Sequence, residues 1–362
     1  MFWKIVLICV VAFFGMDRAI ACTGIAQKAE NGDWVFARTM EFGADLISFD
    51  LLFVPRGIAY SSEISTNQTG SKWTTKYGHV GFNPFGMPIL ADGLNEKGLA
   101  CGAFYFPGWA EYEQIPSQNN PKAISNLDFV SWVLGNFATV SEVQDALKET
   151  KVVGVQFAAW GFIPPLHYFL VDQTGEKAVV EYVGGQLKIY NPALGTITNS
   201  PDYEWHTVNA RNYIGLRALN DPTIKISGHE FSQFGQGSGA IGLPGDFSPP
   251  SRFIRAAFLN TVVLKGKDGP EQVDRAFKIL NQFDIPKGAI KGVNKGKEFY
   301  DTTQWTSAAD LSNTQYFFHT ANNREIRSVS IKNLDLDAKS IKSLTVNTPE
   351  VIKDLSASLK SK

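Results

Sequence analysis

The stretch AIACTGIAQKAENGDWVFARTMEFG, residues 19–43, decides how this chain is expected to fold and where its chemistry is expected to lie. Two β-rich runs flank Asn31-Gly32, and Asn-Gly between such runs predicts a β-hairpin. Cys22 is then expected at the outer end of the first strand. Arg38 and Glu41 are expected on its hairpin partner or just beyond.

The residues before Cys22 resemble a secretory signal peptide, 1–21. Lys4 supplies a positive charge, IVLICVVAFF is an apolar core of ten residues, and Ala19 and Ala21 fit an A-x-A cleavage site. Such a core is too short to span a bilayer. Cleavage after Ala21 places a thiol and a free α-amine on one residue, Cys22, so that a nucleophile and a base arrive together. The expected location is secreted or periplasmic, with no membrane attachment after cleavage.

Two other interpretations of Cys22 stay open. In the first, Cys22 is simply a small residue near a signal cleavage site. In the second, it is the lipid-bearing cysteine of an anchored, non-catalytic binding protein, since AIAC loosely fits a lipobox. Ala19 at position −3, where leucine is usual, and the charged Asp17 and Arg18 argue against the lipobox. Acylation of the amine would remove the base, so the anchor and the nucleophile exclude each other.

Composition excludes several classes of protein. The chain after residue 21 carries 32 Lys and Arg against 34 Asp and Glu, a net charge of −2, which gives no electrostatic footprint for nucleic acid or an anionic membrane. Only Cys22 and Cys101 remain in it, so the chain is not a disulfide scaffold. Pairing of these two would eliminate a nucleophile at Cys22, whereas a buried, free Cys101 within GLACGAFYF would leave Cys22 free.

The patterns along the chain predict an α+β fold in which helices stack on antiparallel sheets, as one domain over 22–337 with a surface appendage over 338–362. Apolar residues at three- and four-residue spacing and cap residues predict helices over 125–137, with Ser125 or Asn126 as N-cap, and 139–150, 249–264 and 269–283. Strands are predicted over 47–55, 98–106, 153–160, 166–173, 177–190, 303–312, 314–321 and 325–331.

Other motifs favour neither cofactor nor metal. GQGSGA, 235–240, does not lie between a clear parallel strand and a helix, so it is expected to be a loop and not a dinucleotide site. The five histidines lack ligand spacing, no cysteine pair accompanies them, and no G-x-S-x-G elbow is present. Asn67 begins an NQT sequon.

A thiol needs help to ionise at neutral pH, and a guanidinium nearby supplies it. Arg38 is placed by the predicted hairpin to act in this way on Cys22. Without further evidence, an Arg and a Glu at a strand end are usually a solvated surface pair.

Five motifs in sequence order, CTGIA…ARTMEFG, ADGLNEKGLACGAFYFPG, TNSPDYEWH, LPGDFSPPSRFIRAAF and YFFHTANNREIRSVSI, resemble the choloylglycine hydrolase and penicillin V acylase family. The resemblance covers residues 22 to about 336. It implies an N-terminal-nucleophile hydrolase with a four-layer αββα sandwich that cuts linear amide bonds, without a cofactor and as a homo-oligomer, a tetramer in the family.

The resemblance also implies residue roles. Cys22 matches the nucleophile and Arg38 the arginine beside its thiol. Glu41 stands where many members have an aspartate that holds the α-amine. Asn199 matches the asparagine whose amide helps to form the oxyanion hole, and Arg252 matches the arginine that completes the polar shell.

Tyr105 stands where bile-salt enzymes commonly carry asparagine and penicillin V acylases tyrosine, and the family residue contributes its backbone N–H to the oxyanion hole. The expected substrate is a small N-acyl amide: a conjugated bile salt, phenoxymethylpenicillin or an N-acyl homoserine lactone, with Tyr105 favouring the last two. Phe42, Phe106 and Trp109 are expected to form walls of an apolar acyl pocket, although Phe106 suits an ordinary core equally.

Overall fold

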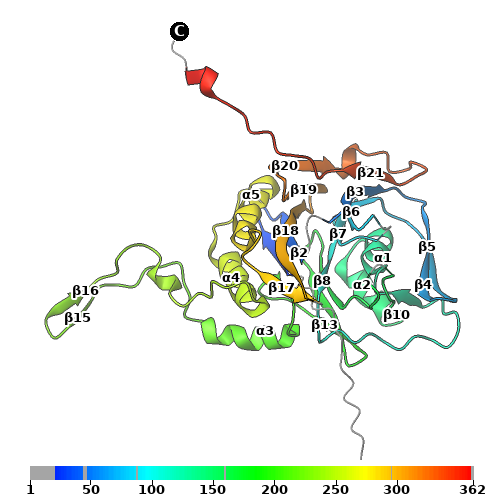
Figure 1. Ribbon diagram of the computed structural model, residues 1–362, viewed down its shortest axis with the longest axis horizontal. Helices are drawn as coiled ribbons and strands as arrows, with labels where there is room; N and C mark the ends of the chain where they lie inside the picture. Colours follow the sequence, from blue (N-terminus) through cyan, green and yellow to red (C-terminus); the bar gives the residue numbers. More distant parts are fainter. Residues whose placement is uncertain (1–20, 44–46, 87–88, 159, 295, 360–362) are drawn as a thin grey trace, which may run out of the picture.

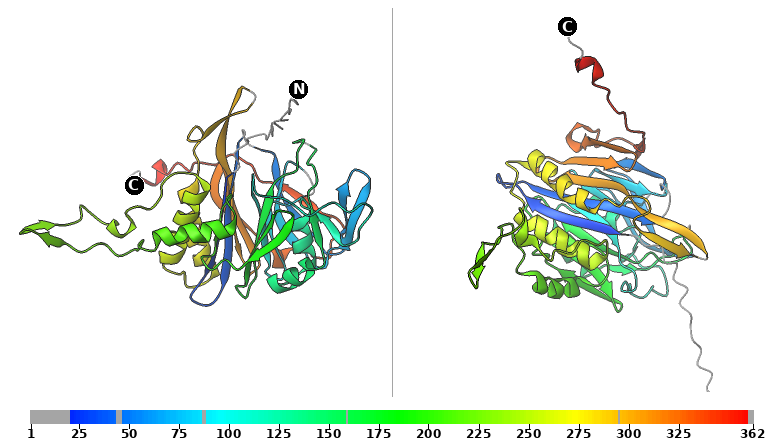
Figure 2. Two further views of the ribbon diagram at one scale, coloured as in Figure 1. Left: turned by 90° about the horizontal axis from the view of Figure 1, so that it is seen from below. Right: turned by 60° about the vertical axis from the view of Figure 1, so that its left-hand side comes forward.

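The computed structural model describes residues 21–43, 47–86, 89–158, 160–294 and 296–359. Two large, mainly antiparallel sheets lie face to face, with helices on the outer side of each, so the order of the layers is helix, sheet, sheet, helix (Figure 1). The view from below in Figure 2 shows the layers edge-on. The predicted α+β four-layer sandwich is confirmed.

The first sheet carries the predicted hairpin. Its strand order is β14-β1-β2-β18-β19-β20, and β17 pairs with one end of β18. The strands are β1 (Cys22–Lys28), β2 (Trp34–Gly43), β14 (Thr196–Ile197), β17 (Lys291–Asn294), β18 (Lys297–Asp310), β19 (Gln315–Thr320) and β20 (Asn323–Ser330).

The second sheet has the order β13-β12-β11-β8-β7-β6-β3-β21. Its strands are β3 (Phe49–Val54), β6 (His79–Pro84), β7 (Asp92–Asn95), β8 (Ala100–Tyr105), β11 (Leu166–Val171), β12 (Lys177–Val183), β13 (Gln186–Tyr190) and β21 (Lys342–Thr345). Three small pairs complete the strands: β4 (Ala59–Ser65) with β5 (Gln68–Thr74), β9 (Ala123–Ser125) with β10 (Lys151–Val153), and β15 (Ile224–Ile226) with β16 (His229–Phe231).

Helices cover the outer faces. They are α1 (Phe129–Asn136), α2 (Val140–Leu147), α3 (Tyr203–Ala210), α4 (Pro249–Val262) and α5 (Gly269–Leu280). Apolar side chains of α4 and α5 pack on β1, β2 and β18, whereas α1 and α2 pack on the second sheet. The largest apolar cluster, which includes Phe36, Phe82, Phe169 and Trp305, fills the space between the sheets.

The β1–β2 hairpin forms where Asn31-Gly32 predicts it. Gly32 has a φ of +101°, a conformation that a side chain would strain, and the Asn31 side chain bonds to Asp33. The register that follows from this turn pairs Cys22 with Met40. The short turn therefore decides which residues of β2 stand beside Cys22.

Three predictions about elements need correction. Helix α1 begins after Asp128 and not at Ser125 or Asn126, because residues up to Ser125 belong to β9. The strand predicted over 153–160 is wrong, since only Val153 lies in a strand there. The single strand predicted over 177–190 is instead two antiparallel strands, β12 and β13, joined by Gly184-Gly185. In addition, neither α3 nor the β4–β5 hairpin was predicted.

The segment after Asp337, predicted to be a surface appendage, contributes β21 to the edge of the second sheet beside β3. Beyond it, the backbone N–H of Glu350 donates to the carbonyl of Asn322, and the chain then runs away from the body to a short 3₁₀ turn at Ser356–Leu359 (Figure 1).

Candidate active site

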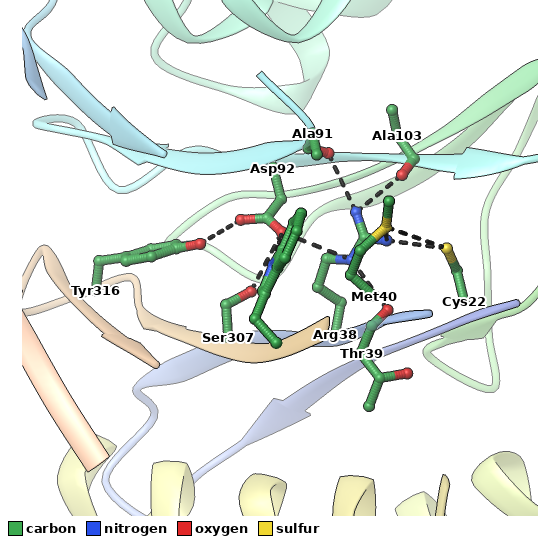
Figure 3. Close-up of polar contacts among 10 residues, drawn as sticks. Cys22, Arg38, Thr39, Met40, Ala91, Asp92, Ala103, Ser307 and Tyr316 are labelled. Carbon is green, nitrogen blue, oxygen red and sulfur yellow. Dashed lines mark hydrogen bonds and ion pairs between the residues drawn. The ribbon is translucent and has the colours of Figure 1, made fainter. Parts of the chain in front are cut away.

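Cys22 is the first residue of β1 and is only 1% exposed. Its Sγ lies 3.0 Å from Arg38 Nη2 and 3.8 Å from Met40 Sδ (Figure 3). The backbone N–H of Tyr105 also hydrogen-bonds to this sulfur. Strand alternation explains the grouping, because Arg38 and Met40 lie two residues apart on one face of β2, which turns toward the second sheet.

Arg38 is fully buried, and every group around its guanidinium accepts hydrogen bonds. Nη1 donates to the carbonyls of Ala91 and Ala103 at 3.2 and 2.9 Å, and Nε donates to Thr39 O at 3.2 Å. Phe104 lies against the guanidinium, 4.6 Å from its carbon to the ring centroid. The arginine is therefore held on several sides with one edge against the thiol.

Asp92 supplies the negative charge for this cation. Its Oδ2 lies 3.6 Å from Arg38 Nε, and both side chains have no exposure to solvent. Tyr316 Oη, Trp305 Nε1 and Ser307 Oγ all donate to the same carboxylate (Figure 3). Asp92 was not predicted as a site residue, although it lies in the motif ADGLNEKGLACGAFYFPG and begins β7.

Asn199 and Arg252 approach Cys22 from the other side. Asn199 follows β14, and its Oδ1 accepts from the Cys22 N–H at 2.9 Å and from Arg252 Nη2 at 2.6 Å. Its Nδ2 donates to Tyr105 O at 2.6 Å. Arg252, on α4, also donates to Cys22 O and to Thr23 Oγ1.

Glu41 lies on the opposite face of β2 from Arg38, because three positions separate them on an alternating strand. Its Oε1 accepts from Thr303 Oγ1 at 3.4 Å, its Oε2 is among the buried atoms that lack a partner, and its N–H donates to Ala21 O. With Ala21 attached, the N–H of Cys22 is bonded to Asn199, and not to Glu41 as the resemblance implied. Burial raises the pKa of Glu41 to about 7 against the opposing charge of Arg252.

Burial is also the largest influence on the pKa of the Cys22 thiol. It raises the pKa of Cys22, while the charge of Arg38, the Tyr105 N–H and the charge of Arg252 lower it, and Glu41 raises it further. The thiol is consequently protonated at neutral pH, so a nucleophilic role needs a base close to Sγ.

A pocket opens beside Cys22, with about 620 Å³ of empty space that includes its opening to solvent. Its walls are almost entirely apolar, and the one amide among them, Asn126, is already bonded to Pro164 O, Tyr112 Oη and the Val155 N–H. The lining residues are Cys22, Met40, Pro84, Phe85, Ile89, Leu90, Ala91, Ala103, Tyr105, Asn126, Leu127, Val130, Phe157, Trp160, Pro164 and Leu166.

The three aromatic residues predicted to line the pocket lie outside these walls. Phe42 is behind them, stacked on Trp160 and edge-on to Phe85. Phe106 is fully buried against the ring of His167, and Trp109 is 36% exposed in the loop after β8. The aromatic walls come instead from Phe85, Phe157 and Trp160, which irregular segments contribute. Phe157 and Trp160 lie in the segment 153–160 that was wrongly predicted to be a strand.

Two histidines support the Asn199 segment and were not predicted. His167 lies between Glu181 Oε1 at 2.9 Å and Thr198 O at 3.1 Å, and His206 Nε2 lies 2.9 Å from Asn199 O. These contacts join strands and a helix that are far apart in sequence, so spacing carried no signal for them.

Comparison with known proteins agrees with this geometry. The family model for linear amide C–N hydrolases, choloylglycine hydrolase family, matches residues 22–344. The chain belongs to the choloylglycine hydrolase family. It is 34% identical over 330 residues to a bile salt hydrolase/transferase of Clostridium perfringens, covering 90% of this chain and 97% of that protein. It is 28% identical over 344 residues to a penicillin V acylase of Pectobacterium atrosepticum, covering 89% and 84%.

A crystal structure of a variant of the conjugated bile acid hydrolase from Clostridium perfringens superposes with a TM-score of 0.79 at 32% identity, covering 92% of this chain and 99% of that one. The penicillin V acylase from Agrobacterium tumefaciens, at 24% identity and a TM-score of 0.72 over 91% and 94% of the chains, shares the fold.

This chain is therefore a hydrolase of linear amides. A non-catalytic lipid-anchored protein is not favoured.

Two further observations concern the described ranges alone. No group of three or more His, Cys, Asp or Glu is placed there to hold a metal ion. Within the same ranges, no helix is long and apolar enough to cross a membrane. The two cysteines after residue 21 are a separate matter. Cys22 and Cys101 are both free and buried, so the alternative of a disulfide between them is excluded.

Proposed function

We propose that Cys22 becomes the N-terminal residue and nucleophile of this amide hydrolase after cleavage of residues 1–21 during export to the periplasm or the exterior. The predicted signal lies outside the described residues, apart from Ala21. The observation that carries the proposal is the surrounding of Cys22 Sγ by Arg38, by the Tyr105 N–H and by an apolar cavity. Cleavage supplies the missing base, the α-amine.

In the proposed reaction, the α-amine of Cys22 takes the thiol proton while Sγ attacks the amide carbonyl. The oxyanion is stabilised by the Tyr105 N–H and by Asn199 Nδ2, whose two hydrogens allow one bond to Tyr105 O and one to the oxyanion. The C–N bond breaks as the protonated α-amine passes its proton to the leaving nitrogen. Water, deprotonated by the same amine, then hydrolyses the thioester and releases the acid.

We also propose that the substrate has an apolar acyl group, because the described residues that line the cavity are almost all apolar and the Asn126 amide among them is already hydrogen-bonded. Tyr105 favours phenoxymethylpenicillin or an N-acyl homoserine lactone. The similarity to bile salt hydrolases favours a conjugated bile salt as the second candidate. A panel assay of the three classes, with Cys22→Ser as the matched control, selects among them.

N-terminal mass spectrometry of the exported protein tests the maturation. A free Cys22 at the N-terminus is expected. A chain that starts elsewhere, or a blocked amine, would remove the proposed base and refute the mechanism.

Self-association is proposed as well. The segment 211–248, which carries β15 and β16, projects from the body (Figure 2) and exposes apolar side chains such as Leu219, Phe231, Phe234 and Ile241. Exposed apolar surface of this kind is typical of an interface. Light scattering of the protein with and without Phe234→Asp and Ile241→Asp tests it, and a monomeric parent would refute it.

A further inference from the structure

Asp92 is a buried carboxylate that the reaction described above does not use. It comes from β7 of the second sheet, yet its oxygens meet groups from β2, β18 and β19 of the first sheet. Tyr316, Trp305 and Ser307 donate to it (Figure 3). Burial raises the pKa of Asp92, whereas the charge of Arg38 and these three hydrogen bonds lower it. Each of these contacts stabilises the ionised carboxylate relative to the protonated form.

Arg38 needs this anion. The guanidinium is fully buried, and a buried cation is costly unless an opposite charge compensates for it. Among the described residues, Asp92 is the only carboxylate within 4 Å of the Arg38 nitrogens. The remaining partners of Arg38 are neutral carbonyl oxygens and the sulfur atoms of Met40 and Cys22.

The strand register determines how Arg38 connects Asp92 to the Cys22 thiol. Ser307 on β18 stands directly opposite Arg38 on β2, and Ser307 Oγ lies 3.3 Å from Asp92 Oδ2. On the other side, Arg38 pairs with Gly24, where an added Cβ would lie 2.6 Å from the ring of Phe104, the same ring that lies against the guanidinium. Asp92 therefore holds the Nε edge of Arg38 while the Nη2 edge meets the thiol.

We propose that Asp92 is a positioning residue for amide hydrolysis, whose carboxylate orients the Arg38 guanidinium against Cys22 Sγ and so sets the reactivity of the thiol. The inference rests on the proposed function, in which Cys22 is the nucleophile. The charged groups that act on the thiol are Arg38, Glu41 and Arg252. Those near Asp92 are Arg38, Tyr316 and Cys101.

The test measures alkylation of Cys22 by iodoacetamide against pH in the mature chain. A Cys101→Ala background removes the second thiol, whose pKa burial and Asp92 both raise. Asp92→Asn keeps the size of the side chain and one acceptor oxygen but removes the charge. The inflection of the profile is expected to move to higher pH, with alkylation near pH 7 slowed about threefold to tenfold and kcat lowered.

Asp172→Asn is the matched control. Asp172 is also fully buried and also accepts hydrogen bonds, from the Val140 N–H and from Thr174. It follows β11 and contacts the first residue of α2, and it forms no ion pair with Arg38 among the described residues. This variant should lower Tm and leave the alkylation profile unchanged. A purely structural role for Asp92 would give the same result for Asp92→Asn, and that result would overturn the proposal.

A shift of the inflection to lower pH in Asp92→Asn would also overturn it, because Asp92 would then restrain the thiolate by its charge and not position Arg38. If Asp92→Asn does not fold, Tyr316→Phe tests the proposal instead, because it removes one of the donors that hold the Asp92 carboxylate. Its alkylation profile should also move to higher pH, by less than expected for Asp92→Asn. An unmoved profile in Tyr316→Phe would refute the proposal. The assay reports the thiol whether or not Cys22 is the nucleophile, which Cys22→Ser turnover tests separately.

Discussion

Replacing Glu41 with glutamine removes a carboxyl group that the fold keeps in an unfavourable environment. Glu41 is fully buried, and burial raises its pKa from 4.5 to about 7. Between these two values the folded state binds more protons than the unfolded state. The contribution of Glu41 to stability is therefore fully present below about pH 4.5 and is lost as the pH rises through about 7.

The magnitude follows from the shift. A difference of about 2.5 pH units between the two states corresponds to about 3 kcal/mol of unfolding free energy. Glutamine does not ionise and carries no such cost. The free energy of unfolding of Glu41→Gln, relative to the wild type, should consequently rise by about 3 kcal/mol between about pH 4 and about pH 8.

Urea unfolding followed by tryptophan fluorescence measures this difference, with the chain expressed without export so that Ala21 stays attached as in the structure. Glu176→Gln, which removes an exposed carboxyl, is the control and should give a nearly constant difference. If Glu41→Gln also gave a difference independent of pH, the carboxyl would not be destabilised by its burial. The expectation that Glu41 is protonated in the folded state near pH 6 would then be refuted.

Three further outcomes are expected. Arg38→Ala should slow alkylation of Cys22 near pH 7 by about tenfold or more, because a buried thiol loses the adjacent cation; unchanged kinetics against pH would eliminate Arg38 as the activator. Cys22→Ser should keep substrate affinity, measured by tryptophan fluorescence, but lose nearly all turnover, since a hydroxyl is a far poorer nucleophile at neutral pH; wild-type turnover would mean that another group attacks. Val130→Trp should fill the cavity and raise KM for long acyl groups more than for acetyl amides, and equal effects on both would show that the acyl group binds elsewhere.

Local patterns determined the framework of this protein. Asn31-Gly32 between two β-rich runs specified the hairpin, and the alternation of its strands then brought Arg38 beside Cys22. Cap residues and apolar spacing over 139–150, 249–264 and 269–283 specified α2, α4 and α5. In each case the signal lies within about fifteen residues, where turn chemistry and periodicity act directly on the backbone.

Contacts between distant segments were decided only by the tertiary structure. The resemblance to the family named Asn199 and Arg252, but their contacts with Cys22 depend on the pairing of β14 with β1 and on the packing of α4 against this sheet. Asp92 carries no local mark, since an aspartate before glycine is typical of a turn.

Alternation along β2 already puts Glu41 on the face opposite Arg38. Only the tertiary structure buries that face and brings the charge of Arg252, on α4, close enough to act on the Glu41 carboxyl. The aromatic walls of the cavity come from Phe85, Phe157 and Trp160, whose irregular backbone has no period. A local pattern sets which elements form, whereas the burial of one sheet against another decides which polar groups must find partners across the gap, and this second requirement builds the site.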